Sequence, residues 1–256
     1  MENQFLKNIQ KGLKVEIVTK QKKLAKGYIE DIAKREEYNS QGILVRLKTG
    51  EIGRVQKIIL NEEQLNKKYL IEIEKLVKSG ESLHTEFKLN VLWSINYGKD
   101  EIRGSKSNEV HEFGVKASKV IVAKSIAAFL NSEGGSLIIG IKEKKEGNVR
   151  YELRGLSEDY EKMKDPSADA YRRMLIDEVV RQYFPSKIYN HLNDYIRIEF
   201  VEIEGKILCW IKIKKSDTRV FLKLNDKDVF MIRIDSENRN LEGEKLVDYC
   251  VKHFKN

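Results

Sequence analysis

The sequence predicts an α+β protein in which a small β-barrel precedes a larger domain of mixed helices and strands. Short alternating apolar runs, separated by glycines, fill the first 60 residues, as expected of a small barrel. Helical and strand periodicities then alternate along the rest of the chain. Hydrophobic residues make up 41% of the chain, which suffices for a packed core. We therefore expect a barrel at 1–60, a connecting helix at 61–80 and an α+β domain at 81–256.

The N-terminal segment, residues 1–60, is predicted to have a basic surface. It holds 13 Lys and Arg against 7 Asp and Glu, a net charge of +6, whereas the whole chain carries +8. This concentration of positive charge indicates an anionic partner, and the alternative is a solvated lysine-rich surface. The residues expected to contact nucleic acid in this segment are Lys20, Lys22, Lys23, Lys26, Arg46 and Arg54.

Residues 61–89 are expected to form a helix and then a strand. Asn61 followed by two glutamates is an N-cap signature, and Gly80 closes the helix. A strand follows at 85–89. The polar segment at 90–114 has little periodicity, so it is either a disordered insertion or an ordered lid that contacts nucleic acid through Arg103 and Lys106.

The rest of the chain is expected to alternate between helices and strands. Gly134 and Gly135 end one helix, and the apolar run after them is typical of a central strand buried on both faces. Pro185 ends another helix. The predicted helices are 115–132, 167–184 and 242–254, and the predicted strands are 136–141, 195–203, 206–214 and 229–234.

The chain is expected to be cytoplasmic and to have no membrane partner. Its N-terminus is polar and lacks the apolar region of a signal peptide. No apolar run reaches the roughly 18 residues that cross a bilayer. Cys209 and Cys250 share no spacing typical of a disulfide framework or a zinc site, so we expect both to be small buried side chains.

Two resemblances extend these expectations. The patterns at 12–20, 26–32 and 42–55 resemble the YwbE-type small domain, which implies an SH3- or KOW-like barrel, a class often found on RNA. From about residue 72 to the C-terminus, the chain resembles the Schlafen-type AlbA-like domain. The opening motif of that domain falls at 79–88, its glycine-containing centre at 127–141, and its closing strand, with an arginine before a polar turn, at 230–241.

The nuclease branch of this family implies a metal site of three acidic residues, which fall here on Glu81, Glu86 and Glu143. Clustered carboxylates repel one another unless a divalent cation neutralises them, and oxygen ligands favour Mg²⁺ or Mn²⁺. Lys88 would stabilise charge that develops on a phosphate during catalysis. Lys142 and Glu143 stand where the family has an Asp-Asp pair, and this departure favours a non-catalytic function.

The alternation of the strand at 85–89 places His84, Glu86 and Lys88 on one face. Glu81 has an odd number and would point to the opposite face if the strand extended back to it, so it must reach the site from the preceding turn or across a bulge. His84 is either a general base or a surface or packing residue. A solvated strand face is the alternative to a metal site for Glu86 and Lys88.

Two functions are compatible with these residues. The leading interpretation is a Schlafen-like endoribonuclease, a metal-dependent hydrolase that acts on structured RNA such as tRNA. The alternative is a non-catalytic nucleic-acid-binding or nucleotide-binding regulatory module, although the chain has no GxxxxGK[ST] loop for ATP. Full Schlafen cores pair two copies of this domain, so the resemblance also implies a homodimer.

Overall fold

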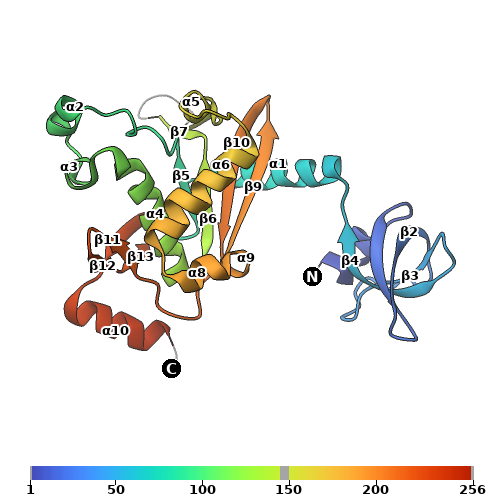
Figure 1. The fold of residues 1–256 in the computed structure, drawn as a ribbon. Helices are drawn as coiled ribbons and strands as arrows, with labels where there is room; N and C mark the ends of the chain where they lie inside the picture. The colour runs from blue at the N-terminus through green and yellow to red at the C-terminus, as the bar shows by residue number, and fades with distance from the viewer. Residues whose placement is uncertain (1, 145–149, 255–256) are drawn as a thin grey trace. The chain divides into compact units, whose positions relative to one another are not determined.

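The computed structural model describes residues 2–144 and 150–254, and the chain divides into two compact units between Tyr69 and Leu70 (Figure 1). Each unit has its own cluster of buried apolar side chains.

The first unit is a closed four-stranded barrel. Its strands are β1 (Lys14–Thr19), β2 (Leu24–Ile32), β3 (Leu44–Leu47) and β4 (Ile52–Ile59), and two short 3-10 turns precede them. All neighbouring strands are antiparallel, and β1 pairs with both β2 and β4, which closes the barrel. Alternate side chains such as Val15, Ile17 and Val55 are fully buried inside. The predicted barrel is confirmed.

Helix α1 (Glu62–Ser79) follows the barrel. At its start the Asn61 Oδ1 accepts a hydrogen bond of 2.7 Å from the Gln64 N–H, and the Asn61 N–H donates to Gln64 Oε1 at 3.1 Å. This reciprocal pair satisfies backbone groups that the first turn leaves open. Gly80 ends the helix with a φ of +79°, a conformation that glycine adopts without strain.

The second unit contains a four-stranded sheet in the order β5-β6-β10-β9. The strands are β5 (Thr85–Lys88), β6 (Gly135–Ile139), β9 (Ile196–Ile203) and β10 (Lys206–Ile213). β5 is an edge strand that runs parallel to β6, whereas β6 and β9 are antiparallel to β10. The prediction of an α+β domain with a central apolar strand is therefore confirmed.

Helices cover one face of this sheet (Figure 1). The main ones are α4 (Ala117–Asn131) and α6 (Ala168–Met174), which continues through a π-helical turn, Leu175–Val180, into α7 (Arg181–Tyr183). Other short helices are α5 (Ser157–Tyr160), α8 (Ser186–Asn190) and α9 (Leu192–Tyr195), and α10 (Gly243–His253) is the C-terminal helix. Within the described residues, no helix is both long and apolar enough to span a membrane.

The segment at 90–114 is ordered, which corrects the prediction of a disordered insertion. It carries α2 (Lys99–Gly104) and α3 (Asn108–Phe113) and leads through a 3-10 turn into α4. The buried Asp159 carboxylate accepts hydrogen bonds of 2.8 Å from the N–H groups of both Val91 and Leu92. These bonds attach the start of the segment to the helical layer, and sequence periodicity cannot reveal them because the partners are 67 and 68 residues apart.

Three two-stranded ladders complete the unit. They are β7 (Ile141–Glu143) with β8 (Tyr151–Leu153), β11 (Leu222–Leu224) with β12 (Lys227–Val229), and β13 (Met231–Ile234) with β14 (Glu237–Asn240). The strand predicted at 136–141 is in fact divided between β6 and β7. Gly140 separates the two with a φ of +103°, and a Cβ at this position would lie 2.8 Å from a Leu208 methyl group.

Candidate functional site

The turn before β5 brings Glu81 beside that strand. Ser82 and Thr85 exchange two backbone hydrogen bonds of 3.0 and 3.3 Å, which reverse the chain. The Glu81 Oε1 then accepts a hydrogen bond of 2.8 Å from the backbone N–H of Phe87. The Glu81 N–H donates to the Tyr151 hydroxyl at 3.3 Å. Glu81 therefore reaches the strand from a turn, as the alternation of β5 requires.

Glu86 lies on β5 with an exposed fraction of 4% and has a basic partner on each oxygen. The Lys88 ammonium group pairs with Oε1, and the Arg233 guanidinium group pairs with Oε2. A buried carboxylate is costly unless it is paired and hydrogen-bonded, so these two cations explain how Glu86 can lie in the core. A solvated strand face, the alternative drawn from the sequence, does not describe Glu86.

Arg233, on β13, connects the closing strand to the turn before β5. Its side chain has no exposed surface and donates to the carbonyl oxygens of Ser82 at 3.0 Å and Thr85 at 2.8 Å. It also donates to Asn238 Oδ1 at 3.0 Å and lies 5.0 Å from the Phe129 ring centroid. The sequence places Arg233 in the closing motif but cannot identify its partners, because they come from distant parts of the chain.

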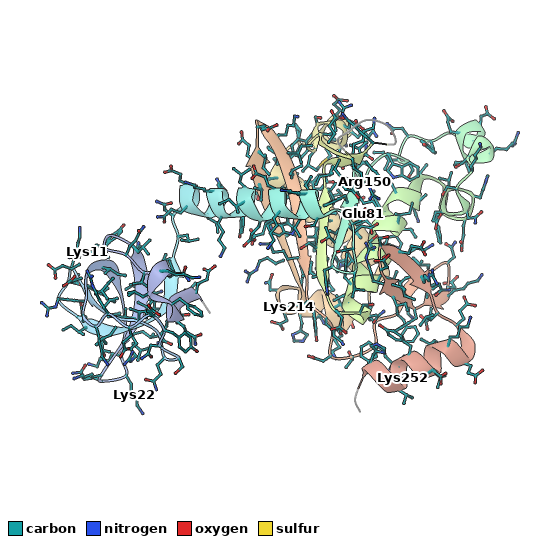
Figure 2. The ribbon with its side chains drawn as sticks, turned by 180° about the vertical axis from the view of Figure 1, so that it is seen from behind. Lys11, Lys22, Glu81, Arg150, Lys214 and Lys252 are labelled. Atoms are coloured by element: carbon teal, nitrogen blue, oxygen red, sulfur yellow. The ribbon has the colours of Figure 1, made fainter. Side chains whose placement is uncertain are left out.

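Glu143 is exposed at the end of β7 and pairs with Arg150 at 3.2 Å. It lies opposite Tyr151 in the β7–β8 ladder, and the Arg150 guanidinium lies 5.3 Å from the Tyr151 ring centroid. Since the Tyr151 hydroxyl accepts from the Glu81 N–H, the ladder brings Glu143 to the edge of the sheet where Glu81 lies. Figure 2 shows Glu81 and Arg150 close together at this edge.

The electrostatic environment of Glu81 differs from that of an exposed glutamate. Burial raises the pKa of its carboxyl group, and the charge of Glu86 raises it further. The Phe87 N–H and the charges of Lys88 and Arg233 oppose this shift, but the net pKa is raised. Glu81 therefore keeps its proton to a higher pH than an ordinary glutamate does.

The three acidic residues predicted as metal ligands do not form a ligand group in this arrangement. Among the residues that the structure describes, no three His, Cys, Asp or Glu side chains lie close enough together to hold a metal ion. Both oxygens of Glu86 contact cationic groups, and Glu143 pairs with Arg150. A divalent cation would have to displace these basic groups, so the donor set as it stands does not fit Mg²⁺ or Mn²⁺. His84 is exposed, and its Nδ1 lies 3.3 Å from the Gly134 carbonyl oxygen.

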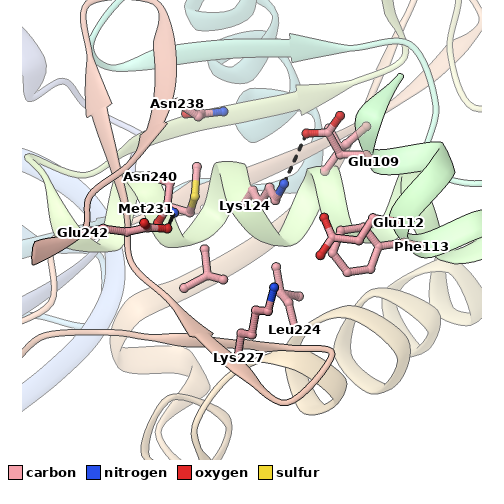
Figure 3. Close-up of a pocket in the computed structure, with 12 residues that line it drawn as sticks. Glu109, Glu112, Phe113, Lys124, Leu224, Lys227, Met231, Asn238, Asn240 and Glu242 are labelled. Atoms are coloured by element: carbon pink, nitrogen blue, oxygen red, sulfur yellow. Dashed lines mark hydrogen bonds and ion pairs between the residues drawn. The ribbon is translucent and has the colours of Figure 1, made fainter. Parts of the chain in front are cut away.

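A polar hollow of about 470 Å³ is lined by Asn238, a hydrogen-bond partner of Arg233 (Figure 3). Asn238 connects the two, because its Oδ1 accepts from Arg233 while its Nδ2 donates to Ser125 Oγ at 3.0 Å. Lys124 and Glu109, which form an ion pair of 3.2 Å, also line the hollow. The hollow carries charges of both signs, and the three predicted metal ligands do not line it.

The basic residues predicted to contact nucleic acid lie at the surface of their own units. Five of the six in the barrel are exposed: Lys20, Lys22, Lys23, Lys26 and Arg46. Lys22 projects from one end of the barrel (Figure 2). Arg54 is partly buried and donates to the Gly42 carbonyl oxygen at 2.9 Å. In the second unit, Arg103 and Lys106 are exposed at the end of α2 and just after it. Their contact with nucleic acid stays a prediction.

Comparisons with known families cover most of the chain. Residues 81–242 match the family model described as Schlafen, AlbA_2. Residues 2–58 match DUF2196, a family described as an uncharacterized conserved protein. The curated protein YwbE from Bacillus subtilis is 44% identical over 63 residues, which are 23% of this chain and 97% of YwbE.

Two solved structures are also similar. The DIP2311 protein from Corynebacterium diphtheriae matches with a TM-score of 0.40 and 14% identity, over 75% of this chain and 30% of that protein. This chain therefore spans less than a third of the DIP2311 chain. The N-terminal domain of a protein related to the ATP-dependent DNA helicase RecG, from Nitrosomonas europaea, matches with a TM-score of 0.35 and 15% identity, over 70% of this chain and 95% of that domain.

Proposed function

Because this chain belongs to the Schlafen, AlbA_2 family, which indicates a nucleic-acid-binding protein, we propose that it binds structured RNA such as tRNA without cleaving it. The basic residues of the barrel, together with Arg103 and Lys106, supply phosphate contacts. The acidic cluster around Glu86 acts as a neutralised structural anchor.

One observation carries the non-catalytic part of this proposal, namely the pairing of both Glu86 oxygens. Arg233 is fully buried and holds two backbone carbonyl groups of the turn as well as Glu86. Removing one partner of a buried ion pair costs about 3–5 kcal/mol. A metal ion that replaced Arg233 at Glu86 would leave this guanidinium group buried without its counter-charge.

The proposal is tested by incubating the full chain with a labelled tRNA pool in Mg²⁺, in Mn²⁺ and in EDTA. We expect the RNA to be retained by the protein in a filter-binding assay and to be recovered intact on a denaturing gel under all three conditions. Loss of retention at low salt would reject RNA binding, and metal-dependent fragments would reject the non-catalytic assignment.

A second candidate is a metal-dependent endoribonuclease that uses Glu81, Glu86 and Glu143 with Mg²⁺ or Mn²⁺. It is supported by the position of Tyr151, which links Glu81 to the ladder that carries Glu143. For this candidate, Glu81→Gln and Glu86→Gln would abolish cleavage while RNA retention persists. Cleavage that is unchanged in both variants would exclude these residues as its catalytic group.

We also propose that two chains form a homodimer on RNA, as symmetric oligomers commonly do. Light scattering of the protein with tRNA is expected to give twice the 29.9 kDa protein mass per complex after the RNA contribution is subtracted. A single chain per complex at saturating RNA would rule out the dimer and leave RNA binding intact.

A further inference from the structure

The outer face of the barrel strands β4, β1 and β2 carries three rows of side chains, with a register shift in the β1–β4 pairing between the second and third rows. The strand register aligns Ile59, Lys14 and Tyr28 in one row. The second row is Lys57, Glu16 and Lys26, and the third is Arg54, Val18 and Leu24. Side chains between these positions, such as Val15 and Ile17, point into the core and are fully buried. The nine outer positions therefore share one surface, which we call the grid face.

The grid face combines positive charge with exposed apolar groups. Four of its side chains are basic and one is acidic, a net charge of +3. Glu16, the one acid, pairs with Lys26 at 3.2 Å. Tyr28 and Leu24 are exposed to 50% and 65%, and the Lys14 ammonium group lies 5.7 Å from the Tyr28 ring centroid. The ring of Tyr28 is thus accessible beside a cation.

A hollow of about 520 Å³ continues the third row. Val18 and Arg54 belong to both, and the amide side chains of Gln41 and Gln56 add hydrogen-bonding groups. A Cβ at Gly53 would lie only 2.4 Å from the Val18 carbonyl oxygen, so only glycine fits this position in the hollow wall. The hollow therefore has an apolar floor next to polar groups that can pair with the edge of a planar ring.

We infer that the grid face and its hollow bind an unpaired stretch of nucleic acid, an assignment that rests on the proposed RNA binding. Lys14, Lys26 and Lys57 neutralise phosphates, whereas Tyr28 and Leu24 contact base faces. Bases inside a duplex are stacked on one another, so only an unpaired strand can offer its faces to Tyr28. The alternating cations and apolar groups fit a polymer in which charged and planar units also alternate.

The inference is tested with the full chain by fluorescence anisotropy on three labelled probes: an unpaired RNA oligonucleotide, single-stranded DNA of the same sequence, and an RNA duplex. Tyr28→Ala is expected to weaken binding of the unpaired probes by about 5- to 100-fold, since stacking contributes about 1–3 kcal/mol per base. Tyr28→Phe keeps the ring and is expected to stay within about twofold of wild type. Lys14→Gln should weaken binding more than Lys48→Gln, which removes an exposed charge from the β3–β4 turn outside the grid face.

The outcomes separate this inference from the proposed function. Tighter binding of either unpaired probe than of the duplex, lost in Tyr28→Ala, supports the grid face and identifies RNA or DNA as the ligand. Wild-type binding of tRNA with no effect of Tyr28→Ala or Lys14→Gln would overturn the inference alone and favour protein docking at this face. Failure of the wild type to bind any of the probes or tRNA would overturn the proposed function as well.

Discussion

The guanidinium group of Arg233, which has no exposed surface, joins three parts of the second unit. It contacts the turn before β5 through the carbonyl groups of Ser82 and Thr85, the strand itself through Glu86, and the β13–β14 turn through Asn238. In a low-dielectric interior each of these charge-assisted bonds is stronger than at the surface. The geometry of the acidic cluster therefore depends on one residue from the end of the chain.

Arg233→Ala is expected to lower the free energy of unfolding by about 3–5 kcal/mol. The substitution leaves the buried Glu86 carboxylate without the guanidinium group that pairs with it, and it leaves the carbonyl groups of Ser82 and Thr85 without their donor. Urea denaturation measures the loss. Arg239→Ala is the matched control, since Arg239 pairs with Glu237 at the exposed surface of the neighbouring strand β14 and its loss should cost no more than about 0.5 kcal/mol. Equal effects of the two substitutions would show that Arg233 does not hold the turn before β5 and Glu86 as described.

Glu81 should make stability depend on pH. Burial raises the pKa of its carboxyl group in the folded state above the ordinary value of a glutamate, so the folded protein binds this proton more tightly than the unfolded chain does. The resulting stabilisation is fully present below the unfolded pKa and is lost as the pH rises through the folded pKa. In EDTA, Glu81→Gln should reduce the pH dependence of the unfolding free energy between pH 4.5 and the raised pKa. Urea titrations across that pH range measure this dependence. Superimposable slopes for wild type and variant would disprove this.

Sequence alternation predicts that Glu86 and Lys88 share a face and that Glu81 comes from a turn, and both hold in the structure. It does not predict that Glu86 is buried. That outcome depends on Arg233, which pairs with Glu86 from 147 residues away and which local patterns cannot place. The ion pairing of Glu86 therefore rests on a long-range partner as well as on Lys88.

At the scale of elements, the main helices and the β9–β10 hairpin follow from periodicity and breakers in the sequence. The hairpin, for example, turns at Glu204 and Gly205, both with positive φ. Two features do not follow. Gly140 divides an apolar run into two strands of different ladders, and Asp159 orders a segment that looks featureless in sequence. In both cases tertiary contacts determine the local structure, because the sequence preference of the segment alone does not.

Asp159→Ala is expected to release the segment at 90–114. Two buried N–H groups and the Tyr171 hydroxyl, which donates to Asp159 at 2.6 Å, would lose their acceptor, at about 1–3 kcal/mol for each unsatisfied group. Hydrogen exchange should accelerate at residues 91–113 more than in β6 or β10. The control is Asp165→Ala, which removes an exposed carboxylate that pairs with Arg173 at the surface. Exchange that rises uniformly over the unit would argue against a local anchor.

At the scale of the whole molecule, the chain combines two units with separate cores and an uneven distribution of charge. The barrel segment carries +6 of the total +8, and its exposed cations and the grid face lie on that one unit. Phosphate contacts supply affinity and orientation rather than sequence choice. We therefore assign most of the electrostatic affinity for RNA to the barrel.

Deletion of residues 1–60 should weaken tRNA binding and flatten its salt dependence. Each phosphate contact to a single strand contributes about 0.7 to the slope of log affinity against log salt, so the loss of four or more contacts lowers the slope by about 3. The retained second unit keeps its own core, which circular dichroism can verify. If the slope of log affinity against log salt is unchanged after the deletion, the barrel does not supply the phosphate contacts, and binding of a protein partner becomes its favoured function.

The most direct test of the account is the affinity of the full chain for labelled tRNA, measured across a salt series in EDTA and repeated in Mg²⁺. The account predicts tight binding at low salt, a steep loss of affinity as salt rises, and intact RNA under both conditions. Breakdown of tRNA that appears only with Mg²⁺, or the absence of binding at low salt under both conditions, would contradict it.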